Sequence, residues 1–165
     1  MYINGEEVGY NEDSKNPAEY LVNNFLRPGK NILILKIYRW STGSYLECQD
    51  FWRLSGIERD VFLYSQPKAS IKDFRITSTF DDSYKNGIFK VAIDMKNHKD
   101  STVALKVCYE LIGALNKIVA SGETKLLLPS GRIKTVTFER QLQDVKTWTS
   151  ESPNLYNMIM TIQED

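Results

Sequence analysis

Three pairs of neighbouring carboxylates are the residues of this sequence that could do acid and base chemistry. Paired carboxylates hydrolyse glycosidic bonds, one as the acid and the other as the base or nucleophile. Adjacent residues of a strand project to opposite faces, however, and adjacent residues of a turn are hydrated. We therefore expect none of these pairs to be catalytic: Glu6-Glu7, Glu12-Asp13 and Asp81-Asp82.

Other reactive side chains are equally isolated in the sequence. The single histidine, His98, lies in a polar segment between two expected strands, where a solvated turn is a better interpretation than a catalytic base. Cys48 and Cys108 have no second cysteine or histidine at ligand spacing, so we expect free thiols. No glycine-rich loop follows a strand and opens a helix. The residues alone indicate a β protein without an identifiable reaction.

Charge and hydropathy argue against two classes of partner. The chain has 21 Lys and Arg against 21 Asp and Glu, so no basic field is available for nucleic acid. The longest apolar run, residues 31–38, is interrupted by Lys36 and is too short for a membrane span, so we expect no membrane partner. The N-terminus opens directly on a strand-like segment, Tyr2-Ile3-Asn4-Gly5, which leaves cytoplasmic and periplasmic localisation both open.

Alternation with a period of two dominates the chain and predicts an all-β protein. In the first part, Asn4-Gly5 predicts a hairpin turn, because both residues tolerate positive φ. Residues 32–40 predict a strand buried on both faces. Residues 16–26 predict one or two helical turns, and 61–64 a further strand. Four or five short strands in some 65 residues cannot close a jelly roll, so this part is expected to be the back half of a larger domain.

Proline and small polar residues in 65–70 predict a linker, with domains at 1–66 and 67–165. Beyond the linker, strands recur at the spacing of an immunoglobulin-like sandwich. One expected face carries Phe89, Val91, Ile93 and Met95, and the next strand alternates from Val103 to Leu111. We expect seven strands: 71–80, 88–95, 102–111, 117–120, 125–128, 132–142 and 155–162.

The segment 39–61 combines aromatics, carboxylates and arginines without strand periodicity. Aromatic faces that stack on sugar rings and carboxylates that accept from hydroxyls would suit carbohydrate recognition. The alternative is structural, and we favour it for the tryptophans and arginines. In that interpretation Trp40 and Trp52 are core anchors, and ion pairs form among Arg53, Arg59 and Asp60.

The same segment closely resembles the hallmark stretch of family 2 glycoside hydrolases in its β-galactosidase form. Flanking motifs agree, namely Asn4 to Tyr10 near the start and Trp148 to Tyr156 near the end, so the resemblance covers the whole chain. The hallmark residues are Arg39-Trp40-Ser41, Gly43-Ser44-Tyr45-Leu46-Glu47, Gln49-Asp50, Trp52-Arg53, Ser55-Gly56-Ile57 and Arg59-Asp60-Val61.

The resemblance implies a parent enzyme with a galactose-binding-like jelly roll, a sandwich and a (β/α)₈ barrel whose two glutamates hydrolyse terminal β-galactosides with retention. By this resemblance the sequence stops before the barrel. The resemblance therefore implies no catalytic residue in this sequence, no cofactor in the fragment, and no activity of the fragment alone. Magnesium and sodium are metals that the resemblance implies for the parent enzyme rather than for this fragment. The implied partners are the β-galactoside, the catalytic barrel and the front half of the jelly roll.

One functional residue follows from the resemblance. Asp50 corresponds to an aspartate that, in similar enzymes, contacts galactose hydroxyls and neighbours a sodium ion. The alternative is that Asp50 only caps a turn. Cys48 departs from the aspartate common at its position, which leaves the acidity of the rim open.

Two other functions stay open at this point. The parent could be a β-glucuronidase or β-mannosidase, and Tyr45 to Asp50 discriminates because those branches do not usually keep this block. The chain could also be a stand-alone carbohydrate-binding or adhesion module. An incomplete jelly roll exposes strand edges, so we expect a homodimer of the fragment through residues 1–64.

Overall fold

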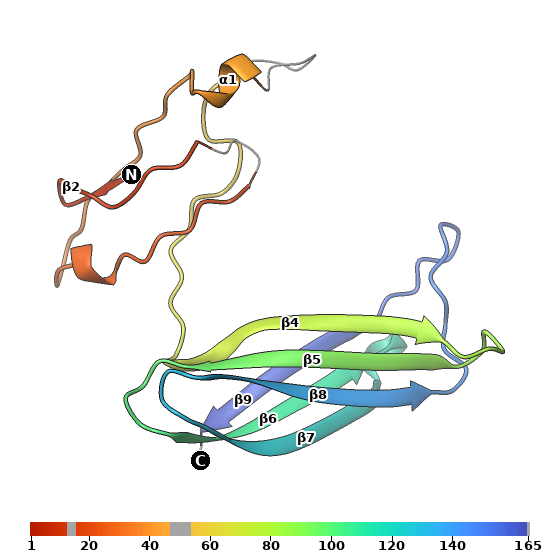
Figure 1. Ribbon diagram of the computed structural model, residues 1–165. Coiled ribbons are helices and arrows are strands. Elements are labelled where there is room, and N and C mark those ends of the chain that lie inside the picture. Colours follow the sequence, from red (N-terminus) through yellow and green to blue (C-terminus); the bar gives the residue numbers. More distant parts are fainter. Residues whose placement is uncertain (13–15, 47–53, 165) are drawn as a thin grey trace. The chain divides into compact units, whose positions relative to one another are not determined.

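The computed structural model describes residues 1–12, 16–46 and 54–164 and divides the chain into two compact units, Met1–Leu63 and Tyr64–Asp165 (Figure 1). Strand accounts for 45% of the chain and helix for 6%, which confirms an all-β protein. Among the described residues, no helix combines the length and the apolar character that crossing a membrane requires.

Unit 1 is built on a small antiparallel sheet with strand order β2-β1-β3. The predicted hairpin is confirmed: Asn4 and Gly5 both have positive φ, 53° and 90°, between paired strands. The predicted helical turn is present as a short 3₁₀ helix. The elements are β1 (Tyr2–Ile3), β2 (Glu6–Glu7), η1 (Asn23–Phe25), β3 (Leu33–Ile34) and α1 (Gly43–Leu46).

Two strand predictions for unit 1 are wrong. Only Leu33–Ile34 of the expected 32–40 strand is paired, and Ile34 and Ile37 are each 51% exposed rather than buried on both faces. Residues 61–64 form no strand. Continuous apolar character predicts burial only where a second layer covers the strand. The described residues of unit 1 supply one three-stranded sheet, so these side chains remain largely uncovered.

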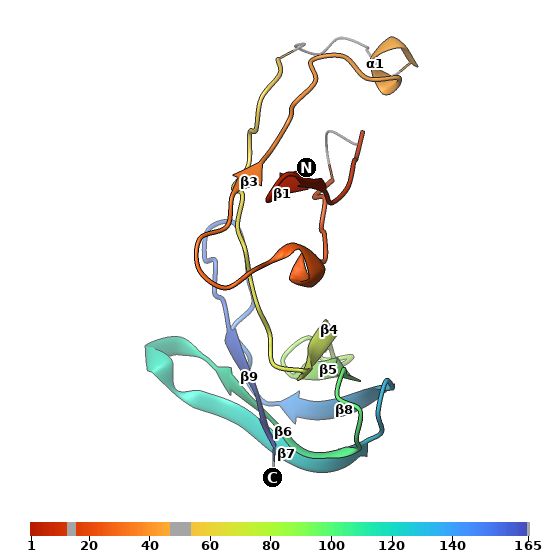
Figure 2. The same cartoon turned by 90° about the vertical axis from the view of Figure 1, so that its left-hand side faces the viewer.

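Unit 2 is a sandwich of two antiparallel three-stranded sheets, with orders β4-β5-β8 and β7-β6-β9. Figures 1 and 2 show the two sheets as separate layers of this unit. The strands are β4 (Ala69–Phe80), β5 (Gly87–Asn97), β6 (Val103–Ile112), β7 (Ile118–Leu128), β8 (Ile133–Leu142) and β9 (Asn157–Glu164), with η2 (Ala114–Asn116) between β6 and β7.

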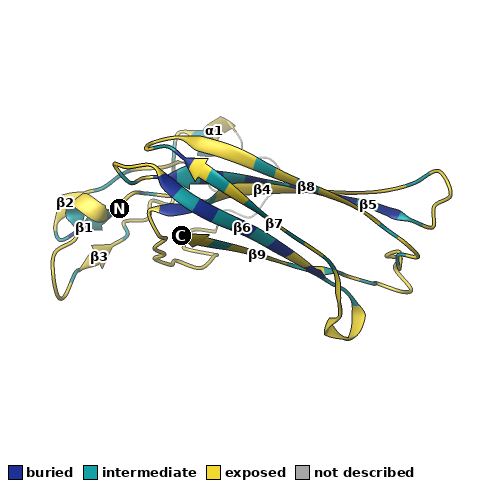
Figure 3. Cartoon of the chain, turned by 90° about the horizontal axis from the view of Figure 1, so that it is seen from below, coloured by how far each residue is buried: buried dark blue, intermediate teal, exposed yellow. Residues whose placement is uncertain are grey.

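The core of the sandwich lies between β5 and β6, as the alternation predicts. The inward side chains of both strands are nearly or completely buried, whereas their neighbours are more exposed (Figure 3). They are Phe89, Val91, Ile93 and Met95 of β5, and Val103, Leu105, Val107, Tyr109 and Leu111 of β6.

The described residues of unit 2 hold six strands rather than seven, because two expected strands are one. The residues 117–120 and 125–128 belong to the single strand β7, which pairs with β6 along its length. Gly122, which falls in the gap between the two expected strands, lies within β7 against the ring of Tyr109. A Cβ at Gly122 would lie 2.7 Å from Tyr109 Cε1, so a small residue is needed there for packing.

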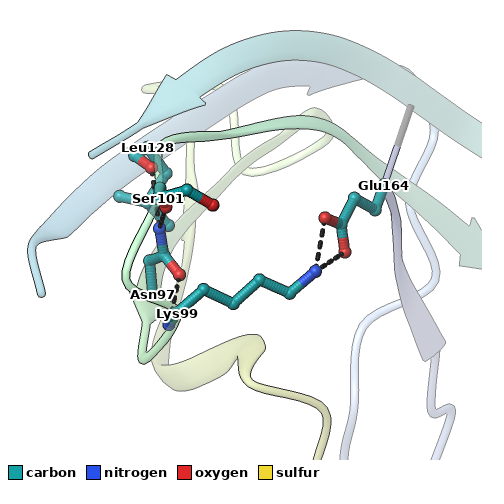
Figure 4. Close-up of polar contacts among 5 residues, drawn as sticks. All are labelled: Asn97, Lys99, Ser101, Leu128 and Glu164. Carbon is teal, nitrogen blue, oxygen red and sulfur yellow. Dashed lines mark hydrogen bonds and ion pairs between the residues drawn. The ribbon is translucent and has the colours of Figure 1, made fainter. Parts of the chain in front are cut away.

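A buried asparagine organises one end of the sandwich (Figure 4). Asn97 has no exposed surface, and its Nδ2 donates to the carbonyls of Ser101 and Leu128 at 2.8 and 3.0 Å. Its Oδ1 accepts from the Lys99 backbone N–H at 2.8 Å. The Lys99 side chain in turn reaches Glu164 of β9, at 2.7 Å to Oε2. These bonds fix the β5–β6 connection, in which His98 is exposed as predicted.

Candidate functional site

An aromatic-lined hollow of about 270 Å³ lies in unit 1 beside β1 and β2. Its two charged side chains, Glu7 and Lys36, are set among aromatic rings, a combination that can stack on a sugar ring and bond to its hydroxyls. The lining residues are Met1, Tyr2, Glu7, Gly9, Tyr10, Lys36, Tyr38 and Trp40.

Cations lie over the aromatic faces at this hollow. The Lys36 ammonium is 5.0 Å from the centroid of the Tyr38 ring, and the Arg39 guanidinium is 5.2 Å from that of Trp40. Hydrogen bonding to the Tyr38 side chain raises the pKa of Lys36, so the lysine is cationic at neutral pH. Trp40 is 47% exposed, so in the described chain it is not the core anchor that the sequence favoured.

A carboxylate joins two distant parts of unit 1 at the start of the hallmark segment. Glu12 accepts the Tyr10 hydroxyl at 2.6 Å and the Thr42 backbone N–H at 3.2 Å. The Thr42 hydroxyl also donates to it, at 3.3 Å. Hydrogen bonding from Tyr10, and then from Thr42, lowers the pKa of Glu12, whereas the same bond raises the pKa of Tyr10. The carboxylate therefore holds residue 42 beside the 10–12 segment while staying ionised.

The hairpin turn is anchored by its own asparagine. Asn4 Nδ2 donates to the Phe25 carbonyl and to Asn31 Oδ1, both at 2.8 Å, and Asn4 Oδ1 accepts from the Ile32 N–H at 3.0 Å. One side chain thus ties the turn to η1 and to the segment entering β3. The turn prediction explains the backbone of Asn4 but did not anticipate this cross-linking role.

The predicted site residue, Asp50, lies outside the described residues, as do Cys48, Trp52 and Arg53.

One member of the expected carboxylate pairs, Asp81, stabilises a turn. Its carboxylate accepts a hydrogen bond from the Ser83 hydroxyl at 2.7 Å and another from the Asn86 side-chain amide at 2.6 Å. These bonds lower the pKa of Asp81. Sequence reasoning missed the link from Glu12 to Thr42, because nothing local signals a contact across 30 positions.

Metal binding has no cluster to support it in the described ranges. No group of three or more His, Cys, Asp or Glu side chains is gathered there in a way that could hold an ion.

Family comparisons match both units. Residues 1–67 match the model described as "Glycosyl hydrolases family 2, sugar binding domain", and residues 69–165 match that of "Glycosyl hydrolases family 2".

Curated relatives are β-galactosidases. The chain is 39% identical over 166 residues to the β-galactosidase of Priestia megaterium, covering 99% of this chain and 16% of that protein. It is 36% identical to that of Alteromonas mediterranea, covering 100% of this chain and 16% of the relative. The chain thus spans about a sixth of the length of these relatives.

Solved structures share the fold at lower identity. A β-glucuronidase of Bacteroides uniformis superposes with a TM-score of 0.83 over 98% of this chain and 20% of its own, at 18% identity. A family 2 member from Bacteroides cellulosilyticus gives a TM-score of 0.78 over 99% of this chain and 22% of its own, at 17% identity. At such identities the likeness concerns the arrangement of strands.

Proposed function

Because the chain belongs to glycoside hydrolase family 2, we propose that it is the non-catalytic scaffold and substrate rim of a β-galactosidase-type enzyme acting on terminal β-galactosides. The observation that carries the proposal is identity over the whole chain, 39% and 36%, to two curated β-galactosidases. The block from Tyr45 to Asp50 supports the same branch.

Each unit has its own part in this proposal. Unit 2 is a platform, because its buried core and paired strands make it rigid and it carries no gathered reactive groups in the described residues. Unit 1 contributes the rim. Glu12 holds Thr42, and the chain continues from there through α1 toward Asp50.

Asp50 is the proposed sugar contact. An ionised carboxylate can accept from two galactose hydroxyls, and each such charge-assisted bond contributes about 1.5 to 3 kcal/mol. Sodium next to Asp50, and magnesium elsewhere, would belong to the assembled enzyme.

A chimera tests the proposal. Residues 1–165 would replace the corresponding segment of the Priestia megaterium β-galactosidase, and hydrolysis of a nitrophenyl β-galactoside would be measured. We expect an active chimera in which Asp50→Ala lowers kcat/KM about 100-fold, equivalent to roughly 3 kcal/mol. Glu58→Ala, an exposed carboxylate of the same segment, is the matched control and should change kcat/KM less than twofold.

Three results would contradict the proposal. A folded chimera that prefers a β-glucuronide would assign the chain to a different branch of the family. Equal effects of Asp50→Ala and Glu58→Ala would remove Asp50 from the sugar site. Titration calorimetry of the 165-residue chain with galactose and lactose should show no binding tighter than millimolar, and tighter binding would instead favour a stand-alone carbohydrate-binding module.

A further inference from the structure

Three connections of unit 2 lie together at one end of the sandwich, which we call the apolar end. They are residues 81–86 between β4 and β5, 113–117 between β6 and β7, and 143–156 between β8 and β9 (Figure 1). The Val145 N–H donates to the Lys85 carbonyl at 3.2 Å, which joins the first connection to the third. A hollow of about 260 Å³, lined from both sides, joins the second connection to the third.

Large apolar side chains are exposed at this end. Leu115, at the tip of the connection between β6 and β7, is 101% exposed, and three others are between 62% and 76% exposed. Those three are Tyr84, Trp148 and Leu155. The opposite end of the sandwich, residues 98–102 and 129–132, carries no large apolar side chain in these described ranges. Clustered apolar exposure of this kind marks a contact surface.

Bulky residues at the apolar end also adopt backbone conformations that they disfavour. The φ angle is 58° at Leu115 and 55° at Tyr84, in the left-handed region that suits glycine and asparagine. Leu115 and Asn116 both have positive φ in a two-residue turn, for which Asn-Gly is the preferred sequence. In the ranges of the opposite end, positive φ occurs at Gly131. Because Leu115 is fully exposed, no burial within unit 2 compensates for its strain, and such strain is characteristic of functional contacts.

The exposure of the apolar end is not produced where the strands of unit 2 start and stop. Ala69, the first residue of β4, pairs with Asn97, and Glu164, the last residue of β9, forms an ion pair with Lys99. Both residues therefore lie at the opposite end of the sandwich. The three connections of the apolar end lie wholly within the described residues, so their conformation is set by unit 2 itself.

The size of the apolar end indicates which kind of partner would fit. A stable contact between separate proteins takes about 20 to 30 residues on each side. Four exposed side chains on turn tips are far fewer. A partner in the same polypeptide is present at an effective concentration of roughly millimolar, so a small contact is sufficient. This chain covers 16% of each of the two β-galactosidase relatives, and a parent of that length has ample chain to supply the partner.

We propose that the apolar end of unit 2 docks on the remainder of the same enzyme polypeptide, with Leu115 and Trp148 packed against an apolar surface there. The inference rests on the proposed function, which supplies the longer polypeptide, and extends it by naming the docking surface. The contact would fix unit 2 at the end opposite Ala69 and Glu164. The sandwich would thereby become a platform of defined orientation.

Thiol labelling tests the contact directly. Leu115→Cys would be placed in the 165-residue chain and in the chimera described above, both with Cys48→Ser and Cys108→Ser, and alkylation at position 115 followed by peptide mass spectrometry. We expect the rate of a free thiol in the 165-residue chain and a rate at least about tenfold lower in the folded chimera. Asp100→Cys, exposed at the opposite end, is the matched control and should react at similar rates in both proteins.

The sign of a second effect separates docking from turn strain. Asparagine tolerates the left-handed conformation better than leucine, so Leu115→Asn should raise the Tm of the 165-residue chain by about 2 to 6 °C. In the chimera the same change removes the docked side chain and should lower the Tm by about 2 °C or more. Asn116→Gly relieves strain in the same turn without removing an apolar group, so it should raise the Tm of both proteins.

Two results would overturn the proposal: fast labelling of Leu115→Cys in a folded chimera, or a higher Tm of the chimera with Leu115→Asn. Equal protection of Asp100→Cys would show that the apolar end is not the specific contact. Protection in the 165-residue chain that grows with concentration would assign the surface to a second copy instead. Galactoside hydrolysis is measured separately. An active chimera with an unprotected position 115 refutes only the docking, whereas a folded, inactive chimera with a protected position 115 refutes only the β-galactosidase assignment.

Discussion

Replacing Gly122 with alanine would test the packing that makes β7 one strand. The new Cβ would lie 2.7 Å from Tyr109 Cε1 and 3.3 Å from Phe138 Cδ1. The Tyr109 ring has little room to move, since its centroid is 4.9 Å from that of Phe138 and 5.5 Å from that of Phe89. The added methyl group must therefore displace a packed aromatic cluster.

The expected cost follows from two opposing effects. Overpacking a well-filled core costs about 1 to 3 kcal/mol. Removing a glycine from a strand recovers roughly 0.5 to 1 kcal/mol of backbone entropy. Gly122→Ala should thus lower the free energy of unfolding of unit 2 by about 1 to 2 kcal/mol, which corresponds to a fall in Tm of roughly 5 to 15 °C.

Urea and thermal unfolding followed by circular dichroism would measure the loss. Ser121→Ala, next to Gly122 on the same strand, is the control and should stay within about 0.5 kcal/mol of the parent. In a Tyr109→Leu background, where the ring is absent, Gly122→Ala should cost at least about 1 kcal/mol less. A neutral Gly122→Ala, or the same cost in both backgrounds, would refute the packing explanation.

Three further outcomes are expected. Tyr109→Phe should leave the free energy of unfolding of unit 2 unchanged or raise it by up to about 1 kcal/mol, as measured in urea. The reason is that the buried Tyr109 hydroxyl has no hydrogen-bond partner in the described structure. Asn97→Ala should lower the same free energy by about 3 kcal/mol, since it leaves the buried Leu128 carbonyl without its donor. Because the pKa of Glu12 is lowered in the folded protein, its carboxylate stabilises the fold fully above the ordinary pKa of 4.5. This stabilisation is lost as the pH falls through the lower pKa of the folded state. Unfolding titrations from pH 6 to 3 should show a smaller loss of stability in Tyr10→Phe, which removes the first cause of that shift.

The sandwich strands could be predicted because their pattern is local. Alternating apolar residues predict a strand that buries one face, and in unit 2 the apolar faces of β5 and β6 are both buried in the shared core. The error at β7 has the same origin. A glycine beside polar residues indicates a turn when only neighbours are considered, whereas Gly122 is required by a ring on the adjacent strand.

The opposite error occurred in unit 1. The 32–40 segment is apolar on both faces, and that composition correctly indicates a need for covering layers. Composition does not say whether the covering layers are within the same stretch of chain. Among the described residues only a two-residue ladder with β1 forms, and Leu33 and Ile34 stay about half exposed.

The sequence motif predicts which residue contacts the sugar, but it does not predict how the neighbouring residues are arranged in space. The hallmark segment identifies Asp50 by its neighbours in sequence, and no local feature indicates how the start of that segment is held. Glu12 does so through Thr42, with Tyr10 completing the network. Sequence reasoning treated this carboxylate as a hydrated group and expected no catalytic role for it. Its position is nonetheless specific, because an ionised group with three hydrogen bonds orients the backbone that leads toward the proposed sugar contact. Glu12→Gln in the active chimera would therefore separate orientation from charge. It keeps an acceptor for Thr42 but weakens it, so we expect a smaller loss of kcat/KM than for Asp50→Ala, without the acid dependence that the carboxylate introduces.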